Sequence, residues 1–243
     1  MDNAITESAV PALAFWASAT RGAATAVFGV ALALFIVTSG VRWVTLGESF
    51  YLSEFARYHV GAVTGLSNED LGRVAHAFVT YFQSPPGRLD IVVNLPEGPQ
   101  PLLNEREIAH MIEVQGLMHR IFFIWTWSMV TLVISGGIIV AADQSSGGRA
   151  VLIASVLGGA LAVLTVGALT VASMVNFEQL FWQFHLISFT NDFWLLDPLR
   201  DRLIQLYPEG FFYDAALRIA LVTVAGGALM LVASIVALRT MER

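Results

Sequence analysis

Hydrophobic residues are concentrated in four uninterrupted runs, and each run is long enough to cross a membrane as a helix. The runs cover residues 22–44, 121–142, 150–175 and 216–238. A helix of roughly 20 apolar residues spans the hydrocarbon core of a bilayer, which is about 30 Å thick. No charged side chain lies deep inside any run, which favours a structural scaffold over an ion or proton pathway. The pattern predicts an all-α integral membrane protein with four transmembrane helices.

The segments outside these runs differ greatly in length. They are an N-terminal tail (1–21), three connections (45–120, 143–149 and 176–215) and a C-terminal tail (239–243). The N-terminal tail mixes acidic and apolar residues, and we expect it to be disordered or to lie at the membrane interface. Since the second connection is short, the two long connections fall on the opposite side of the membrane, where they can meet.

Arginines indicate which side of the membrane is which. The short connection and the two tails carry four of them near the ends of the runs: Arg21, Arg149, Arg239 and Arg243. Basic residues are enriched in the cytoplasmic connections of membrane proteins. We therefore expect a multi-pass protein of the inner membrane, with both termini in the cytoplasm and both long loops on the extracytoplasmic face.

The first long loop is expected to be mainly helical. Ser67 is placed to cap a helix with Asp70 in its first turn, and Pro85-Pro86-Gly87 ends that helix. Residues 90–95 alternate enough to form a short strand, and the prolines that follow indicate a turn. Asn104 is then expected to cap a helix that continues into the second run.

Composition narrows the range of functions. Only 13% of the 243 residues are charged, against about 25% in an average soluble domain. The net charge of −6 argues against a nucleic-acid partner, because phosphate groups require clustered basic residues. The absence of cysteine excludes a disulfide, a thiolate nucleophile and a cysteine-ligated metal. The motifs of phosphate-binding loops, serine hydrolases and zinc proteases are also absent.

His110 lies between two acidic residues, Glu107 and Glu113, at a spacing of three. On a helix, this spacing places all three on one face. A carboxylate there can hold one ring nitrogen of the imidazole and leave the other free to act as a base. His119 follows after about 900° of helical turn and therefore lies on the opposite side. Any catalytic partner of His110 must come from elsewhere in the chain.

The second long loop contains one histidine, His185, among several aromatic residues. If residues 177–196 form a helix, Asp192 returns to the face of His185. Pro198 would then end the helix, with Asp197 just before it. Burial beside aromatic rings favours the neutral imidazole, which is the form that a general base needs. Interfacial helices without catalytic function have the same composition, so these residues alone leave both interpretations open.

Two segments are similar to known sequences. Residues 105–114 read EREIAHMIEV, and residues 184–198 read FHLISFTNDFWLLDP. Together with the four runs, they resemble the bacterial lipoprotein intramolecular transacylase family of integral membrane proteins. The resemblance implies that an acyl chain moves from the glycerol ester of a diacylated lipoprotein to the α-amino group of its N-terminal cysteine, which gives a lyso-form lipoprotein. It also implies that His110 and His185 are the important histidines.

This resemblance assigns further roles in a reaction that needs no cofactor or metal. One histidine removes a proton from the attacking amine, and the other protonates the leaving glycerol oxygen. Asn191 and Trp194 are candidate donors to the oxyanion, with anchoring at the membrane interface as the alternative role of Trp194. Asp192 and Asp197 are expected to orient other groups. Glu113 stands where the family pattern has aspartate, which keeps the charge but changes the reach. The partners implied are the diacylated lipoprotein and membrane lipids.

Two other functions fit the same residues. His110, Glu113 and His185 could bind zinc in a metal-dependent membrane hydrolase or transferase that keeps one coordination position open. Alternatively, the outer loops bind a partner without catalysis, as in a membrane assembly protein. The sequence gives no indication of the oligomeric state.

Overall fold

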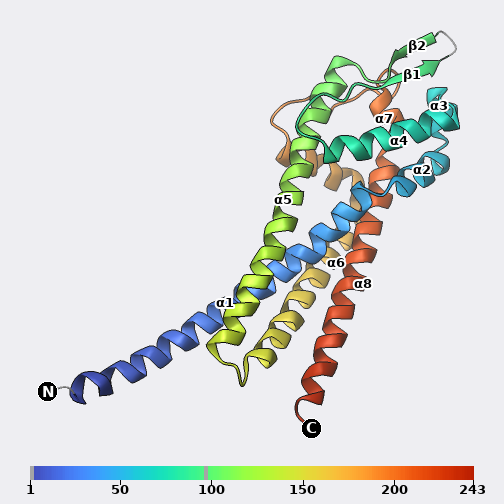
Figure 1. Ribbon diagram of the computed structural model, residues 1–243. Helices are drawn as coiled ribbons and strands as arrows, with labels where there is room; N and C mark the ends of the chain where they lie inside the picture. Colours follow the sequence, from blue (N-terminus) through green and yellow to red (C-terminus); the bar gives the residue numbers. More distant parts are fainter. Residues whose placement is uncertain (1–2, 96–97) are drawn as a thin grey trace. The chain divides into compact units, whose positions relative to one another are not determined.

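The computed structural model describes residues 3–95 and 98–243, and most of them are helical (Figure 1). The elements in chain order are α1 (Asn3–Thr45), α2 (Glu48–Arg57), α3 (Val60–Thr64), α4 (Asn68–Gln83), β1 (Val92–Leu95), β2 (Gly98–Pro101), α5 (Glu105–Ala142), α6 (Gly147–Ser188), α7 (Arg202–Leu206) and α8 (Glu209–Thr240). In the described residues, α1 from Ser18 onward, α5, α6 and α8 are long and apolar enough to cross a membrane. The predicted all-α membrane fold with four spans is therefore confirmed.

The first helix begins earlier than the hydrophobic pattern indicated. Residues 3–21 were expected to be a disordered or interfacial tail, but they are helical and continuous with the first run. Residues 1–2 of that tail lie outside the described part of the chain.

The chain divides into two compact units. One, the span unit, comprises the residues up to 39 together with 124–167 and 221–243. The other, the loop unit, comprises residues 40–123 and 168–220. The loop unit therefore contains both long loops and the ends of the helices that lead into them.

Glycines let the helices of the span unit approach each other closely. A Cβ atom on Gly158 of α6 would lie 2.5 Å from the carbonyl oxygen of Gly29 in α1. A Cβ atom on the next residue, Gly159, would lie 3.1 Å from the carbonyl oxygen of Gly227 in α8. By contrast, Gly137 of α5 has open space around it. Small residues thus let α6 pack against α1 and α8 by close backbone contact, which is common among helices in lipid.

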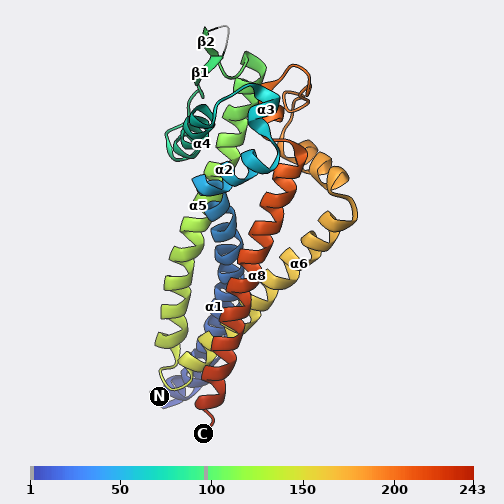
Figure 2. The ribbon, with the colours of Figure 1, turned by 90° about the vertical axis from the view of Figure 1, so that its right-hand side faces the viewer.

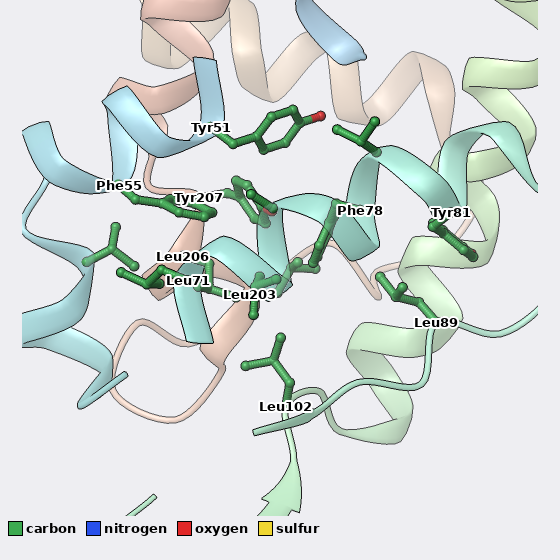
Figure 3. Close-up of a cluster of buried hydrophobic side chains, with 14 of the residues drawn as sticks. Tyr51, Phe55, Leu71, Phe78, Tyr81, Leu89, Leu102, Leu203, Leu206 and Tyr207 are labelled. Carbon is green, nitrogen blue, oxygen red and sulfur yellow. The ribbon is translucent and has the colours of Figure 1, made fainter. Parts of the chain in front are cut away.

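Aromatic and aliphatic side chains together form the core of the loop unit (Figure 3). The ring centroid of Tyr207, just before α8, lies 4.9 Å from that of Phe78 in α4 and 5.6 Å from that of Phe55 in α2. Tyr207 also contacts the rings of Tyr51 and Phe211. Each of these large rings removes much apolar surface from water. The core therefore joins the helices of the first long loop to the end of the second.

Side-chain caps begin α4 and α5 where the sequence predicted them. The hydroxyl oxygen of Ser67 accepts a hydrogen bond from the Asp70 amide at 3.1 Å, at the start of α4. At the start of α5, Asn104 Oδ1 accepts from the Glu107 amide at 3.0 Å. In return, Glu107 Oε2 accepts from the Asn104 amide at 2.7 Å. This reciprocal pair is a capping box, and it satisfies two amides that the helix leaves free.

The strand predicted at residues 90–95 is shorter and has a partner. β1 pairs with β2 in antiparallel register, with Leu95 opposite Gly98 and Val92 opposite Pro101 (Figure 1). The prediction that Pro99 and Pro101 belong to a turn was wrong, because both lie in β2, and Pro96 lies outside the described residues. In a sheet of two strands both are edge strands, where proline is tolerated.

Helix α6 changes direction at Asn176 (Figure 2), whose backbone angles of φ −159° and ψ 88° are not helical. The Asn176 side chain accepts a hydrogen bond from the Gln179 amide at 2.9 Å and so caps the helix that restarts there. This restarted helix ends at Ser188, and residues 189–201 form an irregular segment before α7. The helix predicted over residues 177–196 was therefore too long, because it ends at Ser188 and not at residue 196.

Candidate active site

His110 of α5 and His185 of α6 lie next to each other in the loop unit. Their ring centroids are 6.2 Å apart, and the ring planes are inclined by 32°. Both side chains are buried, with exposed fractions of 7% and 8%. The fold thus brings together two histidines that come from different long loops.

Aromatic rings enclose this histidine pair. Phe181 and Trp194 contact His185, with centroid distances of 4.4 and 4.8 Å. Phe189 contacts both imidazoles, at 4.9 Å from His110 and 5.7 Å from His185. Because burial penalises a charged ring, the enclosure favours neutral imidazoles. Sequence reasoning treated Phe189 only as part of an apolar setting, although its position four residues after His185 indicates a shared helical face.

The main chain fixes the orientation of His185. Its Nδ1 lies 2.8 Å from the carbonyl oxygen of Phe181, one helical turn earlier. A carbonyl oxygen can only accept, so Nδ1 carries the proton and Nε2 carries the free lone pair. His185 is therefore held in the tautomer that can take up a proton at Nε2.

Glu113 is the acidic residue that faces His110. Its Oε2 lies 3.9 Å from Nδ1 of His110, which is beyond hydrogen-bond distance. Both atoms are buried, and neither has a hydrogen-bond partner. The other carboxylate oxygen, Oε1, accepts a hydrogen bond from the side-chain amide of Asn191. Glu113 therefore connects the face of His110 to the irregular segment 189–201.

No hydrogen bond joins Glu107 to His110, although the two are three residues apart on α5. Glu107 Oε2 accepts from the Asn104 amide at 2.7 Å, and Oε1 accepts from the Leu203 amide at 2.6 Å. Backbone amides thus occupy both oxygens, and the expectation that Glu107 holds the imidazole was wrong. Glu107 instead fastens α7 to the start of α5.

The two donors expected to stabilise an oxyanion are already engaged. The side-chain amide of Asn191 donates to Glu113. The indole Nε1 of Trp194 donates to the carbonyl oxygen of Asn191 at 2.8 Å. Trp194 has a single N–H and therefore offers no free donor to a reacting carbonyl group, whereas Asn191 keeps a second amide N–H, and its role as an oxyanion donor stays a prediction.

Asp192 and Asp197 are both exposed residues of the irregular segment. The carbonyl oxygen of Asp192 accepts from the Arg106 side chain at 2.6 Å. The carboxylate of Asp197 accepts from the Leu199 amide at 2.9 Å and stabilises a local turn. The prediction that Asp192 shares a helical face with the second histidine was wrong, because the helix ends before it at Ser188.

The other three histidines have local roles. His59 is exposed and adopts a left-handed conformation with φ 52° between α2 and α3. His76 is exposed and lies 3.2 Å from a carboxylate oxygen of Glu48. Nε2 of His119 lies 3.2 Å from the carbonyl oxygen of Phe82. These three histidines thus have the conformations and contacts that are common for residues at the surface or in connections between helices.

The zinc hypothesis requires His110, Glu113 and His185 to converge on one point. Across residues 3–95 and 98–243, no group of three or more His, Asp or Glu side chains is arranged to hold a metal ion. Glu113 Oε1 and His185 Nδ1 are instead turned toward other partners. The geometry gives no support to a metal-dependent hydrolase.

A family assignment covers most of the chain and includes both histidines. The model of the family described as lipoprotein intramolecular transacylase Lit matches residues 26–212. The chain belongs to this family. As a Lit-family protein with four membrane-crossing helices, it is a membrane-bound acyltransferase.

Solved structures of Lit from Bacillus cereus share this fold. One, of the membrane-integral transacylase, has a TM-score of 0.74 and 22% identity and covers 93% of this chain and 99% of the other. A second, in which one histidine is replaced by arginine, has a TM-score of 0.73 and 22% identity and covers 96% and 99% of the two chains. At this identity, the similarity shows the fold alone. No curated protein sequence matches the chain.

Proposed function

We propose that this Lit-family protein moves an acyl chain from the glycerol ester of a diacylated lipoprotein to the α-amino group of its N-terminal cysteine. The observation that carries the proposal is the pair of buried imidazoles, His110 and His185, whose ring centroids lie 6.2 Å apart. Family membership supplies the type of reaction. The two histidines supply the general acid–base chemistry that the reaction needs.

The proton balance of the reaction explains why two neutral imidazoles are useful. An α-amino group has a pKa of roughly 8 and arrives largely as an ammonium ion with three protons. The amide product keeps one proton, so two protons must leave the nitrogen. One of them goes to the departing glycerol oxygen and the other to water. Each of two buried, neutral histidines can accept one of these protons.

The different surroundings of the two rings give each histidine a different proton transfer. His185, whose Nδ1–H is bound to a carbonyl oxygen, takes the first proton at Nε2 and leaves a neutral amine. That amine attacks the ester carbonyl carbon, so that a C–N bond forms and the C–O bond to glycerol breaks. His110, which has a carboxylate beside it, takes the second proton and passes it to the glycerol oxygen. The proton on His185 then leaves to water, and both rings are neutral again.

No protein nucleophile is required, because the amine and the ester belong to one molecule. Holding them in the reacting geometry replaces a collision between two molecules with an internal step, which can supply several kcal/mol of the barrier reduction. The aromatic rings around the histidines are suited to holding the acyl chain and excluding water from it.

Exposed apolar side chains next to the site suit a lipid-anchored substrate. Trp182, Leu186 and Ile187 project from the restarted part of α6, and Ile187 is 84% exposed. Leu199 of the irregular segment is 89% exposed. Such a set is rare on a surface that faces water, and it is typical of segments at a membrane interface. We infer that this surface faces the outer leaflet of the inner membrane and that the long loops are extracytoplasmic.

The test uses a synthetic diacylated lipopeptide without lysine. The reaction leaves the mass of the lipopeptide unchanged but converts its only primary amine to an amide. An amine-reactive dye measures the loss of that amine. His110→Gln and His185→Gln should each lower the rate by at least about 100-fold, the lower limit typical of a lost general acid or base. The exposed His76→Gln should react like the parent, and a chelator should change nothing. Undiminished acyl migration in either site variant would refute the proposal.

A further inference from the structure

Two buried polar atoms face each other in the site without forming a hydrogen bond. They are Nδ1 of His110 and Oε2 of Glu113, which lie 3.9 Å apart. Neither has another partner. Buried polar atoms are nearly always hydrogen-bonded, so an unsatisfied pair at close range needs an explanation.

Asn191 holds the carboxylate in this position. Its side-chain amide donates to Oε1 of Glu113, which leaves Oε2 directed at the imidazole. Asn191 is itself fixed at two other atoms. Its Oδ1 accepts from the Phe193 amide at 3.0 Å, and its carbonyl oxygen accepts from Trp194 Nε1 at 2.8 Å. The Glu113 carboxylate is therefore anchored on the side away from His110 and free on the side toward it.

We propose that Asn191 is a positioning residue that acts through Glu113 on His110. This inference rests on the proposed function and deepens it. Asn191 aims Oε2 at Nδ1, and the gap closes when His110 takes up a proton during the reaction. A charge-assisted N–H···O contact is shorter and stronger than a neutral one, so the imidazolium pulls in a carboxylate that the neutral ring leaves at a distance. Before that step, the carboxylate 3.9 Å from Nδ1 favours the neutral tautomer that carries its proton on Nδ1 and its lone pair on Nε2.

A merely structural role for Asn191 makes a different prediction. In that case the residue would only hold the irregular segment in place, and its loss would lower the thermal midpoint regardless of the residue at position 113. A role through Glu113 instead makes the effect of Asn191 depend on the carboxylate. Residues in contact show such coupling, whereas independent sites are additive.

The kinetic test is a double-mutant cycle on the lipopeptide reaction. Asn191→Ala should lower kcat about tenfold with little change in KM, as expected for an interaction made in the transition state. In a Glu113→Gln background the same substitution should change kcat by no more than about twofold. Thr190→Ala, an exposed neighbour, is the matched control and should react like the parent. Glu113→Asp keeps the charge and should recover part of the rate that Glu113→Gln loses.

A spectroscopic test is independent of activity. In Glu113→Gln, Asn191 still needs an acceptor and therefore directs the oxygen of the new side chain toward itself. The nitrogen of Gln then faces His110 and donates to Nδ1, which moves the ring proton to Nε2. Ring ¹⁵N chemical shifts, assigned by comparison with His110→Gln, should show Nδ1 protonated in the parent and unprotonated in Glu113→Gln. In the double variant that also carries Asn191→Ala, the side chain at position 113 is no longer oriented, so the ring proton should not favour Nε2.

Equal losses of kcat in the two backgrounds, or an unchanged tautomer in Glu113→Gln, would overturn the positioning role. Either result could occur while His110→Gln and His185→Gln still abolish acyl transfer. Failure of this inference is therefore distinguishable from failure of the proposed function.

Discussion

The sharpest consequence of the structure for stability concerns Glu107. Sequence spacing placed it beside His110, whereas the structure places both of its oxygens on backbone amides, one at the start of α5 and one in α7. The side chain is 1% exposed. We predict that Glu107→Ala destabilises the loop unit and does not act on the chemistry directly.

The size of the effect follows from the two hydrogen bonds. Removing the carboxylate leaves the Asn104 and Leu203 amides without an acceptor, and each unsatisfied amide costs about 1–3 kcal/mol. Removing a buried charge offsets part of this cost. We expect a net loss of about 2–4 kcal/mol in the free energy of unfolding. For a chain of this size, that loss corresponds to a fall of roughly 5–15 °C in the midpoint of unfolding.

The assay is thermal unfolding of purified protein in detergent, followed by intrinsic tryptophan fluorescence and compared with the rate of acyl transfer at low temperature. Glu105→Ala is the matched control, because Glu105 lies two residues earlier and forms only an exposed ion pair with Arg88 at 2.8 Å. Exposed pairs contribute little, so its midpoint should equal that of the parent. If Glu107→Ala unfolded like the parent but lost acyl transfer, the carboxylate would act at the reaction centre and this reasoning would be wrong.

Two further predictions concern the membrane-crossing helices. Gly158→Leu should lower the midpoint of unfolding, since overpacking costs about 1–3 kcal/mol and a Cβ atom there would already lie 2.5 Å from a backbone oxygen. Gly137→Leu, which has open space around it, should leave the midpoint unchanged. The absence of cysteine makes single-cysteine labelling a direct test of sidedness. On intact spheroplasts, an impermeant maleimide should label Glu69→Cys in α4 and not Gln144→Cys in the short connection, and the opposite result would invert the topology.

Local signals in the sequence were sufficient to predict where a helix begins when its capping hydrogen bond joins neighbouring residues. Ser67 and Asn104 begin their helices as predicted, because both partners of each cap lie within three residues. A similar signal at Asn176 was overlooked. An Asn followed three residues later by Gln is typical of a helix start, and Asn176 with Gln179 begins a helix inside what reads as one continuous helical pattern.

Tertiary contacts decided the features that sequence reasoning missed. Pro198 predicts a helix end, yet the helix stops earlier, at Ser188, just before the polar cluster Thr190, Asn191 and Asp192, which is typical of a loop. Beyond it, the Asn191 side chain bonds to Glu113, and the Asp192 carbonyl oxygen bonds to Arg106. These contacts with α5 replace hydrogen bonds that a longer helix would have made, and no spacing within the loop encodes them.

The proximity of His110 and His185 has the same origin. Spacing indicated only that His110 needs a distant partner, and similarity to a known family was needed to select His185. The carbonyl group that fixes the His185 tautomer was, by contrast, accessible from sequence. Phe181 lies four residues earlier, so on a helix its carbonyl oxygen lies one turn back, on the same face as the His185 side chain.

The stacking of Trp194 on His185 has a consequence for how substrates are selected. The indole, which comes from the irregular segment, covers one face of the His185 ring, so we expect a diacylated substrate that contacts this face to displace it. The free energy needed to displace the indole must come from the contacts that the fatty chains make in the site. Binding energy used in this way raises the turnover rate and does not tighten substrate binding. Lipopeptides with progressively shorter chains should therefore become slower substrates before they become weaker ligands.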